Sequence, residues 1–183
     1  MATQPKQFIS LEEYLALEQI AEERHEYYNG EMFPMAGSSP QHADIAANLV
    51  RRSGTNSSRG AVYESRTWAS KTPTGLHTYP GAVISCDPQQ YDGDFLMNPL
   101  VTFEVLSDST EARDRGKKFE TYRTIPSFCE YFLIAQDRMY VERYLRRSSH
   151  EWSMREFKAD DVAIETVHLT LPLPLIYANV SLG

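Results

Sequence analysis

The chain has 183 residues, enough for one domain or at most two small ones, and its 42% hydrophobic content can build a core without disulfides. A formal net charge of −7 argues against a protein whose whole surface binds nucleic acid. No stretch of about 18 apolar residues and no basic flank before an apolar run occurs, so the sequence indicates neither a membrane span nor secretion. Cys86 and Cys129 are the only cysteines, and this usage favours the reducing cytosol, so we expect a cytoplasmic protein.

Two helices and a hairpin are expected first along the chain. A capping box that starts at Ser10, followed by apolar residues at helical spacing, predicts a helix over 11–24. Asn29-Gly30 lies between two short apolar arms, which is the strongest hairpin signal in the chain. Pro40 follows a serine at a typical helix start, so a second helix is expected over about 40–53.

The apolar period then changes to that of strands. Runs separated by Pro and Gly clusters predict strands at 61–63, 67–68, 79–85 and 100–106. A third helix is expected at 114–123, a buried strand at 129–134, a hairpin from 139–145 and 152–157, and a short tail segment from 171. No repeat or low-complexity tract occurs, so the sequence predicts a single α+β domain over 1–183 with a strand, strand, helix, strand centre.

Charge is unevenly distributed along the chain. Residues 45–80 carry five basic and one acidic side chain, and residues 115–158 carry ten basic and six acidic ones, while the segments around them are acidic. Two basic segments on either side of an acidic one could form a groove for a polyanion with carboxylates at its floor. The alternative is that these charges lie on ordinary solvated faces.

Several kinds of site are absent from the sequence. It has no phosphate-binding P-loop, no G-x-G-x-x-G turn and no G-x-S-x-G nucleophile elbow. Its five histidines lack the close pairing that is typical of zinc sites. These observations argue against an NTPase, a dinucleotide enzyme, a serine hydrolase and a zinc protein.

One carboxylate and one amine stand out instead. Glu104 lies between Phe103 and Val105 in a strand-like run, where an unpaired charge would be costly. Strand alternation places Glu104 on the face opposite these two neighbours, where a lysine of the next helix could meet it. This pair is either a structural salt bridge or part of a binding site.

The chain resembles a large bacterial family of restriction-endonuclease-like proteins within the PD-(D/E)XK nuclease superfamily. The resemblance runs from Ile9 almost to the end, and it rests on the order and spacing of short pieces rather than on any one of them. These pieces are Leu11-Glu12-Glu13-Tyr14-Leu15, Glu26-Tyr27, Gly30-Glu31, Met35-Ala36-Gly37, Pro40-Gln41-His42, Tyr79-Pro80, Glu104-Val105-Leu106-Ser107, Arg115-Gly116-Lys117-Lys118-Phe119 and Glu130-Tyr131. The resemblance implies a restriction-endonuclease-like core, with a mixed central β-sheet flanked by helices.

The resemblance also implies site residues and a metal. By this resemblance, Glu104 is a catalytic residue and Mg²⁺ ligand, and Lys118 is the catalytic lysine. The usual E-x-K position of the lysine is Leu106 here, so the resemblance implies that the lysine has moved to the following helix. Carboxylates would hold Mg²⁺, which polarises the scissile phosphate, while the lysine stabilises charge. His42 is expected to approach the site, although a histidine in a first helical turn can equally cap or pack.

Position 81 departs from the family pattern. The family has an aspartate after the tyrosine-proline pair, and this chain has Gly81, which offers no side-chain ligand. Asp87 has the right strand parity but lies roughly 20 Å away along a continuous strand. We therefore expect weak Mg²⁺ binding, unless a carboxylate such as Glu31 or Asp44 takes the role.

DNA is the expected partner, with Arg115 and Lys117 as nucleic-acid contacts beside Lys118, although an exposed helix face explains both nearly as well. Tyr63, Trp68 and Tyr79 either stack on bases or belong to the core. Cleavage of two strands suggests a homodimer, and no membrane partner is expected. Two hypotheses follow. The first is a Mg²⁺-dependent endonuclease impaired by Gly81, and the second is a catalytically silent nuclease-fold module that binds nucleic acid or a protein.

Overall fold

The structure is a computed structural model, and it describes residues 8–35, 39–54, 62–64, 69–85, 88–166 and 170–182. None of the helices within these ranges is long and apolar enough to cross a membrane. The predicted strand at 61–63 is confirmed over its described residues, since a strand begins at Val62, whereas the predicted strand at 67–68, Trp68 and Asp87 lie outside the described residues.

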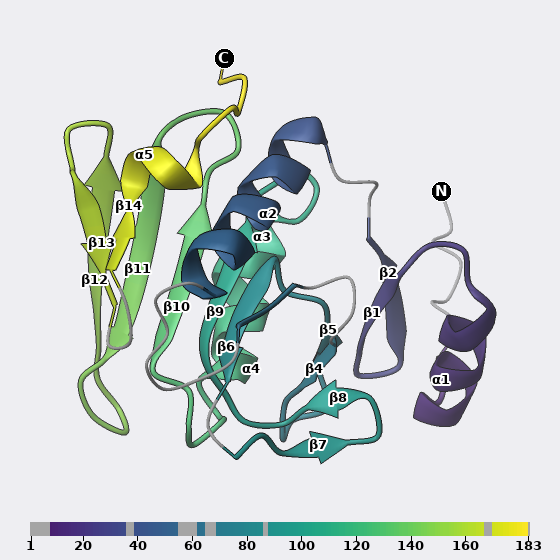
Figure 1. The fold of residues 1–183 in the computed structure, drawn as a ribbon. Helices are drawn as coiled ribbons and strands as arrows, with labels where there is room; N and C mark the ends of the chain where they lie inside the picture. The colour runs from purple at the N-terminus through teal and green to yellow at the C-terminus, as the bar shows by residue number, and fades with distance from the viewer. Residues whose placement is uncertain are drawn as a thin grey trace, which may run out of the picture.

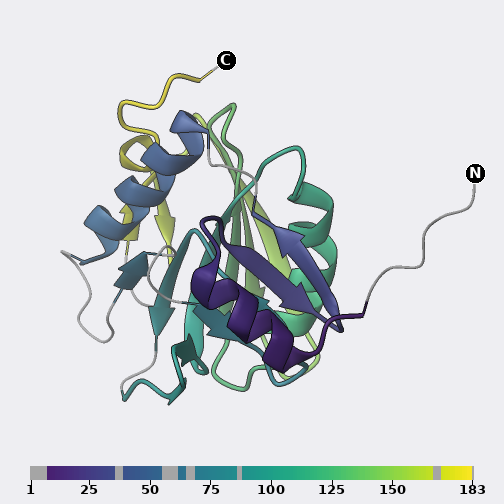
Figure 2. The same cartoon turned by 90° about the vertical axis from the view of Figure 1, so that its right-hand side faces the viewer.

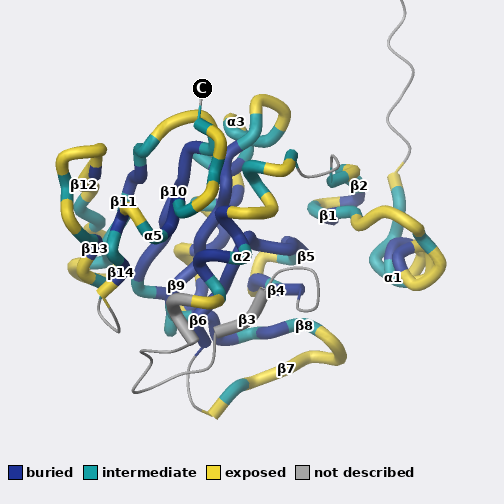
Figure 3. The backbone as a smooth tube through the Cα atoms, turned by 45° about the horizontal axis from the view of Figure 1, so that its top comes forward, coloured by how far each residue is buried: buried dark blue, intermediate teal, exposed yellow. Residues whose placement is uncertain are grey.

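A mixed six-stranded sheet forms the centre of the molecule, with the strand order β12-β11-β10-β9-β6-β3 (Figure 1). β9 and β10 run parallel, and the other neighbours run antiparallel. β9 and β10 are buried over almost their whole length, as their continuous apolar sequences favour (Figure 3). The strands are β3 (Val62–Glu64), β6 (Ala82–Ser85), β9 (Pro99–Val105), β10 (Glu130–Ile134), β11 (Tyr140–Arg146) and β12 (Trp152–Lys158).

Helices cover both faces of this sheet. α2 (Pro40–Gly54) and α5 (Leu173–Ile176) pack on the face that carries Phe103 and Val105, together with the hairpin of β13 (Ala163–Glu165) and β14 (Thr170–Pro172). The other face is covered by one continuous helical segment: α3 (Glu111–Arg113), the π-helix η1 (Asp114–Lys118) and α4 (Phe119–Tyr122). An aromatic cluster that includes Tyr122 and Tyr131 joins α4 to the sheet.

A second sheet lies beside the first, with the order β2-β1-β5-β4-β8-β7. α1 (Leu11–Ile20) packs beside its β1–β2 hairpin (Figure 2), and the Tyr14 ring stacks on Tyr27 at 4.8 Å. The strands are β1 (His25–Tyr28), β2 (Glu31–Pro34), β4 (Ala69–Lys71), β5 (His77–Thr78), β7 (Tyr91–Asp92) and β8 (Phe95–Leu96). This sheet brings β1 and β5 to the side of the central sheet on which Glu104 lies.

Local signals in the sequence are confirmed where they specify one conformation. Both hydrogen bonds of the Ser10 capping box form, and Asn29 and Gly30 have φ values of 50° and 83°, as a tight hairpin turn requires. The mixed α+β architecture with helices on both faces of a sheet is also confirmed.

Three predicted boundaries were wrong. The first helix ends at Ile20 rather than residue 24, because Ala21 is already extended. Only the second part of the predicted strand 79–85 forms, as β6, because residues 79–81 link β5 of the second sheet to β6 of the central sheet and include Pro80, which cannot donate a ladder hydrogen bond. The third helix begins at Glu111 rather than Asp114, and it contains an unpredicted π turn.

Candidate functional site

Glu104 lies near the end of β9, on the face opposite Phe103 and Val105. Those two neighbours pack into the apolar core under α2, whereas Glu104 faces the helical segment on the other side of the sheet. Its side chain is only 6% exposed. The expected meeting with a lysine of the following helix is confirmed, since Glu104 Oε1 lies 3.4 Å from Lys118 Nζ.

Lys118 is the centre of a buried ion-pair cluster. Its ammonium lies 2.7 Å from Glu26 Oε1 and 2.9 Å from Asp114 Oδ1, in addition to Glu104. All four side chains are at most 6% exposed. Asp114 and Lys118 are the first and last residues of η1, so the π turn sets the direction in which both side chains project. A single ammonium thus serves three carboxylates.

Glu26 reaches this cluster from β1 of the second sheet. Its other oxygen accepts a hydrogen bond from the Arg113 guanidinium at 2.5 Å, and the Thr78 hydroxyl of β5 donates to Oε1. Glu26 therefore joins the two sheets and the helical segment at one point. Arg113 in turn lies over the Phe33 ring at 4.4 Å, a second contact that helps to hold the guanidinium in place.

The carboxylates of the cluster differ in how readily they ionise. Burial raises the pKa of Glu104 to about 8, and the nearby Asp114 and Glu26 charges add to this effect, while Lys118 opposes it. For Glu26, burial also disfavours the charged form, but Lys118 and Arg113 outweigh it and hold the pKa below its usual range. The pKa of Lys118 is raised well above its ordinary value, because its three carboxylate neighbours outweigh burial. The cluster therefore holds a charged lysine and a Glu104 that is easily protonated.

Gly81 is the last residue before β6, the strand that pairs with the strand of Glu104. β6 pairs with β9 antiparallel, and this pairing ends with Ala82 opposite Phe103, so Gly81 lies just beyond the paired residues, near Glu104. A Cβ at Gly81 would lie 3.0 Å from the Phe103 carbonyl oxygen and 3.3 Å from Val105 Cγ2. Its φ is not positive, so the backbone accepts other residues, but the neighbours must give by a few tenths of an ångström.

The residues present do not fit a resident Mg²⁺ ion. Glu104 Oε1 and Asp114 Oδ1 are buried without a hydrogen bond, yet the positive charge between them is already supplied by the Lys118 ammonium. Within the described ranges, no group of three His, Cys, Asp or Glu side chains has the spacing of a metal site. Hard cations draw on several oxygen ligands, and Gly81, directly before β6, offers no side-chain oxygen.

The other sequence-predicted residues do not join the cluster. His42 is on α2, which covers the opposite face of the central sheet, and its backbone N–H donates to Ser39 Oγ. Arg115 is paired with both Glu111 at 2.7 Å and Glu142 at 2.5 Å. Lys117 is 42% exposed and pairs with Glu120 at 3.0 Å. The roles of these three residues stay predictions, but Arg115 has little capacity left for a phosphate.

A small hollow of about 150 Å³ opens beside the cluster. It is lined by Glu26, Tyr28, Phe33, Leu76, Arg113, Lys117 and Lys118. Glu104 is not among these residues, so the hollow reaches the lysine from the Glu26 side. Access to the buried carboxylate of β9 therefore requires Lys118 or its partners to move.

Two members of the cluster were missed as site residues in the sequence. Asp114 lies four residues before Lys118, and this i, i+4 spacing on one helix face is a signal that could have found it. Glu26 had only a weak signal, a glutamate within an aromatic hairpin arm, because its partners are far away in the sequence.

Comparisons with known proteins agree with this architecture. Two proteins from Synechocystis are similar to the chain. "Uncharacterized protein slr1290" is 29% identical over 177 residues, which cover 94% of this chain and 93% of that protein. "Uncharacterized protein sll1609" is 30% identical over 172 residues, which cover 90% of this chain and 96% of that protein. A crystal structure from Anabaena variabilis, described as "a putative nuclease belonging to DUF820", has the same fold. It superposes with a TM-score of 0.71 at 16% identity, over 93% of this chain and 98% of that one.

The family comparison covers nearly the whole chain. The model of the Uma2 family, described as "Putative restriction endonuclease", matches residues 11–176. This range contains all four members of the Lys118 cluster and Gly81. The resemblance to a family of restriction-endonuclease-like proteins is therefore confirmed, and the chain belongs to the Uma2 family.

Proposed function

We propose that this chain is an endonuclease-type phosphodiesterase that acts on DNA and whose Mg²⁺-dependent cleavage is impaired. One observation carries the proposal: Lys118 and Glu104, the two residues that the family motif assigns to the site, meet at 3.4 Å, but the ammonium is shared with Glu26 and Asp114. The arrangement keeps the amine and carboxylate of a nuclease centre. It lacks the second carboxylate on β6 that would complete a metal site.

Position 81 offers the most direct test of this proposal. Gly81→Asp restores the missing carboxylate, and Gly81→Ala is the matched control, since it adds the same Cβ near Phe103 without a charge. Plasmid nicking and calorimetric metal titration are measured for the natural sequence and both variants, with Mg²⁺ and with Mn²⁺. We expect little nicking from the natural sequence and from Gly81→Ala, and at least about tenfold more from Gly81→Asp.

Two outcomes would change the assignment. If the natural sequence nicks DNA as well as Gly81→Asp, another carboxylate has taken the role, and Glu26 is the first to replace by glutamine because it is closest to Lys118. If neither protein binds metal or nicks DNA while both stay folded, the second candidate replaces the first: a catalytically silent nuclease-fold module. The burial of the cluster and its saturation by Lys118 favour that candidate.

The proposal extends to the assembly of the protein. Cutting both strands of a duplex needs two sites, so we propose that the chain acts as a homodimer. Sedimentation velocity at micromolar concentration, with and without a duplex, measures the oligomeric state. A monomer in both conditions would limit the proposed activity to nicking.

A further inference from the structure

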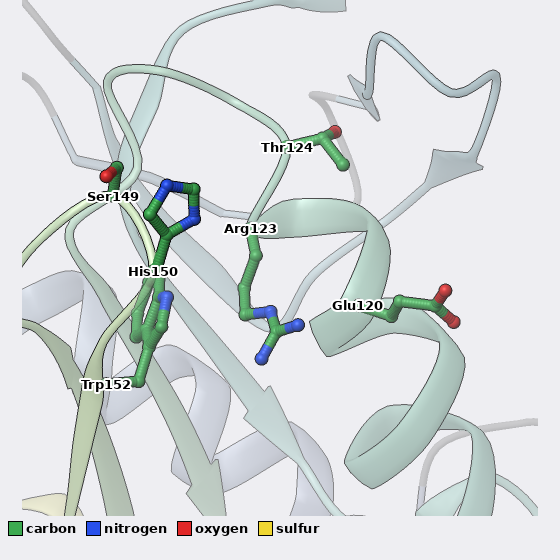
Figure 4. A pocket seen from close by; sticks show the side chains of 6 residues that line it. All are labelled: Glu120, Arg123, Thr124, Ser149, His150 and Trp152. Atoms are coloured by element: carbon green, nitrogen blue, oxygen red, sulfur yellow. The ribbon is translucent and has the colours of Figure 1, made fainter.

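A larger hollow lies away from the Lys118 cluster, at the end of α4. It measures about 330 Å³, and it opens between the end of this helix and the loop that joins β11 to β12 (Figure 4). Six side chains line it: Glu120, Arg123, Thr124, Ser149, His150 and Trp152. A volume of this size is within the range of small-molecule sites.

The floor of this pocket is rigid because Trp152 is packed from several sides. Phe119 meets the indole edge-on at 5.2 Å, and Phe128 lies at 5.9 Å. The Arg146 guanidinium lies over the indole at 5.0 Å and donates hydrogen bonds to the carbonyls of Arg123 at 2.6 Å and of Ile125 at 3.2 Å. The indole is nevertheless only partly buried, so it presents a fixed aromatic surface to the pocket.

The polar groups that face the pocket are mainly hydrogen-bond donors. Figure 4 shows the Arg123 side chain lying between Trp152 and Glu120, while the Glu120 carboxylate points away from it. Glu120 is paired with Lys117, whereas Arg123 has no carboxylate partner among the described residues and contacts only the Phe119 ring, at 5.3 Å. Because Arg146 covers the carbonyls at the end of the helix, their partial negative charge does not repel an anion there. The pocket therefore suits a group that is both planar and negatively charged.

We propose that this pocket binds one nucleotide of a nucleic-acid strand. The phosphate is held by the Arg123 guanidinium and the His150 imidazole, and the base lies against Trp152. Arginine contacts to phosphate and base stacking on an aromatic side chain are the two general means of binding a single strand without sequence preference. The choice of a nucleic acid over another anion rests on the proposed function.

The position of the pocket relative to the Lys118 cluster supports this inference. Lys118 and Arg123 are five residues apart on one helical segment, or about 7 to 8 Å along its axis. Lys117 lines the small hollow beside the cluster, Glu120 lines the pocket, and their ion pair lies between the two. A strand held at Arg123 would thus run along the exposed side of α4 toward the nuclease centre.

The test measures binding without cleavage. The fluorescence anisotropy of a labelled oligothymidylate of ten nucleotides is recorded in EDTA at several salt concentrations. The proteins compared are the natural sequence and the variants Arg123→Gln, His150→Gln and Arg138→Gln. Arg138 is the matched control, since it is 63% exposed and lies on the loop between β10 and β11. We expect Arg123→Gln to weaken binding at least about tenfold and to reduce the slope of log affinity against log salt concentration by about one. His150→Gln should weaken binding less, and the affinity of Arg138→Gln should stay within about twofold of that of the natural sequence.

A second measurement identifies the ligand group. Tryptophan fluorescence is followed during titration with thymidine monophosphate, thymidine and inorganic phosphate, in the natural sequence and in Trp152→Phe. We expect the monophosphate to bind more tightly than either of the others and its signal to be lost in Trp152→Phe. Equal binding of inorganic phosphate would overturn the role of the base, and competition by polyglutamate as strong as that by the oligonucleotide would assign the pocket to an acidic protein segment instead.

The outcomes separate this inference from the proposed function. Equal affinities of Arg123→Gln and Arg138→Gln would refute the pocket, even if the natural protein nicks DNA. Binding that depends on Arg123 in a protein whose Gly81→Asp variant never nicks would support the pocket and refute the nuclease. A natural sequence that does not bind the oligonucleotide at low salt would overturn the pocket, whatever the nicking assay gives.

Discussion

The ionisation of Glu104 should make the stability of this protein fall as the pH rises through neutrality. Burial raises the pKa of Glu104 from an ordinary 4.5 to about 8, so between these values the folded state holds a proton that the unfolded state has released. The free energy of unfolding then decreases with pH, because the folded state binds more protons. This contribution is fully present below about pH 4.5 and is lost as the pH passes 8.

The magnitude follows from the size of the shift. Each pH unit inside this window changes the free energy of unfolding by at most about 1.4 kcal/mol, and the whole window corresponds to about 5 kcal/mol as an upper bound. Glu104→Gln replaces the carboxyl by a neutral group of the same shape, which does not titrate. The difference in the free energy of unfolding between the variant and the natural protein should therefore move by about 2 to 3 kcal/mol in favour of the variant between pH 5.5 and pH 7.5.

Urea unfolding at half-unit steps from pH 5.5 to 8 measures this difference. The lowered pKa of the buried His77 affects both proteins equally and cancels in the comparison. Glu22→Gln, which removes a carboxylate from an exposed position, serves as the control and should show a constant difference from the natural protein. A difference between Glu104→Gln and the natural protein that stays within about 0.5 kcal/mol across the range would refute the reasoning, since Glu104 would then be an ordinary ionised partner of Lys118.

Two further substitutions test the packing around the site. Lys118→Met leaves three buried carboxylates without their ammonium, so the free energy of unfolding should fall by about 3 to 5 kcal/mol and the melting temperature by roughly 6 to 20 °C. The loss should be smaller at pH 5 than at pH 8, and a loss that does not depend on pH would contradict the ion-pair account. Asn48→Ala removes the amide that donates to the carbonyls of Ile176 at 3.0 Å and Ala178 at 2.8 Å. We expect the free energy of unfolding in urea to fall by about 1 to 3 kcal/mol and the C-terminal residues to be digested faster by a protease. An unchanged digestion rate would show that Asn48 does not hold the C-terminal residues in place.

The sequence predicted the parts of the fold that depend on neighbouring residues. The Ser10 capping box and the Asn29-Gly30 turn are local, and both form. The face of β9 on which Glu104 lies follows from strand alternation alone, and the neighbouring helix was close enough in the chain to supply Lys118. These inferences succeeded because few long-range contacts can override them.

The parts that were missed depend on partners from distant segments. Tyr79 to Ser85 reads as one apolar strand, but only Ala82–Ser85 is a strand, and residues 79–81 connect β5, which pairs with β1, to β6, which pairs with β9. Glu26 enters the cluster through that second sheet, which no local period could reveal. The five residues of η1 likewise carry no local signal for a π turn. What distinguishes this turn is that its first and last residues, Asp114 and Lys118, both direct their side chains into the cluster.

Charge balance links Gly81 to the position of Lys118. The buried cluster contains three carboxylates, from Glu26, Glu104 and Asp114, and two cations, from Lys118 and Arg113. A proton on Glu104 leaves two negative and two positive charges, so the cluster is then neutral. A buried site with this balance has no excess negative charge to attract a divalent cation. A carboxylate at position 81 would add one uncompensated charge beside Glu104, which only a further proton or a metal ion could neutralise. Gly81 and the closed cluster around Lys118 are therefore electrostatically consistent, since an ammonium, a guanidinium and a proton balance the three buried carboxylates.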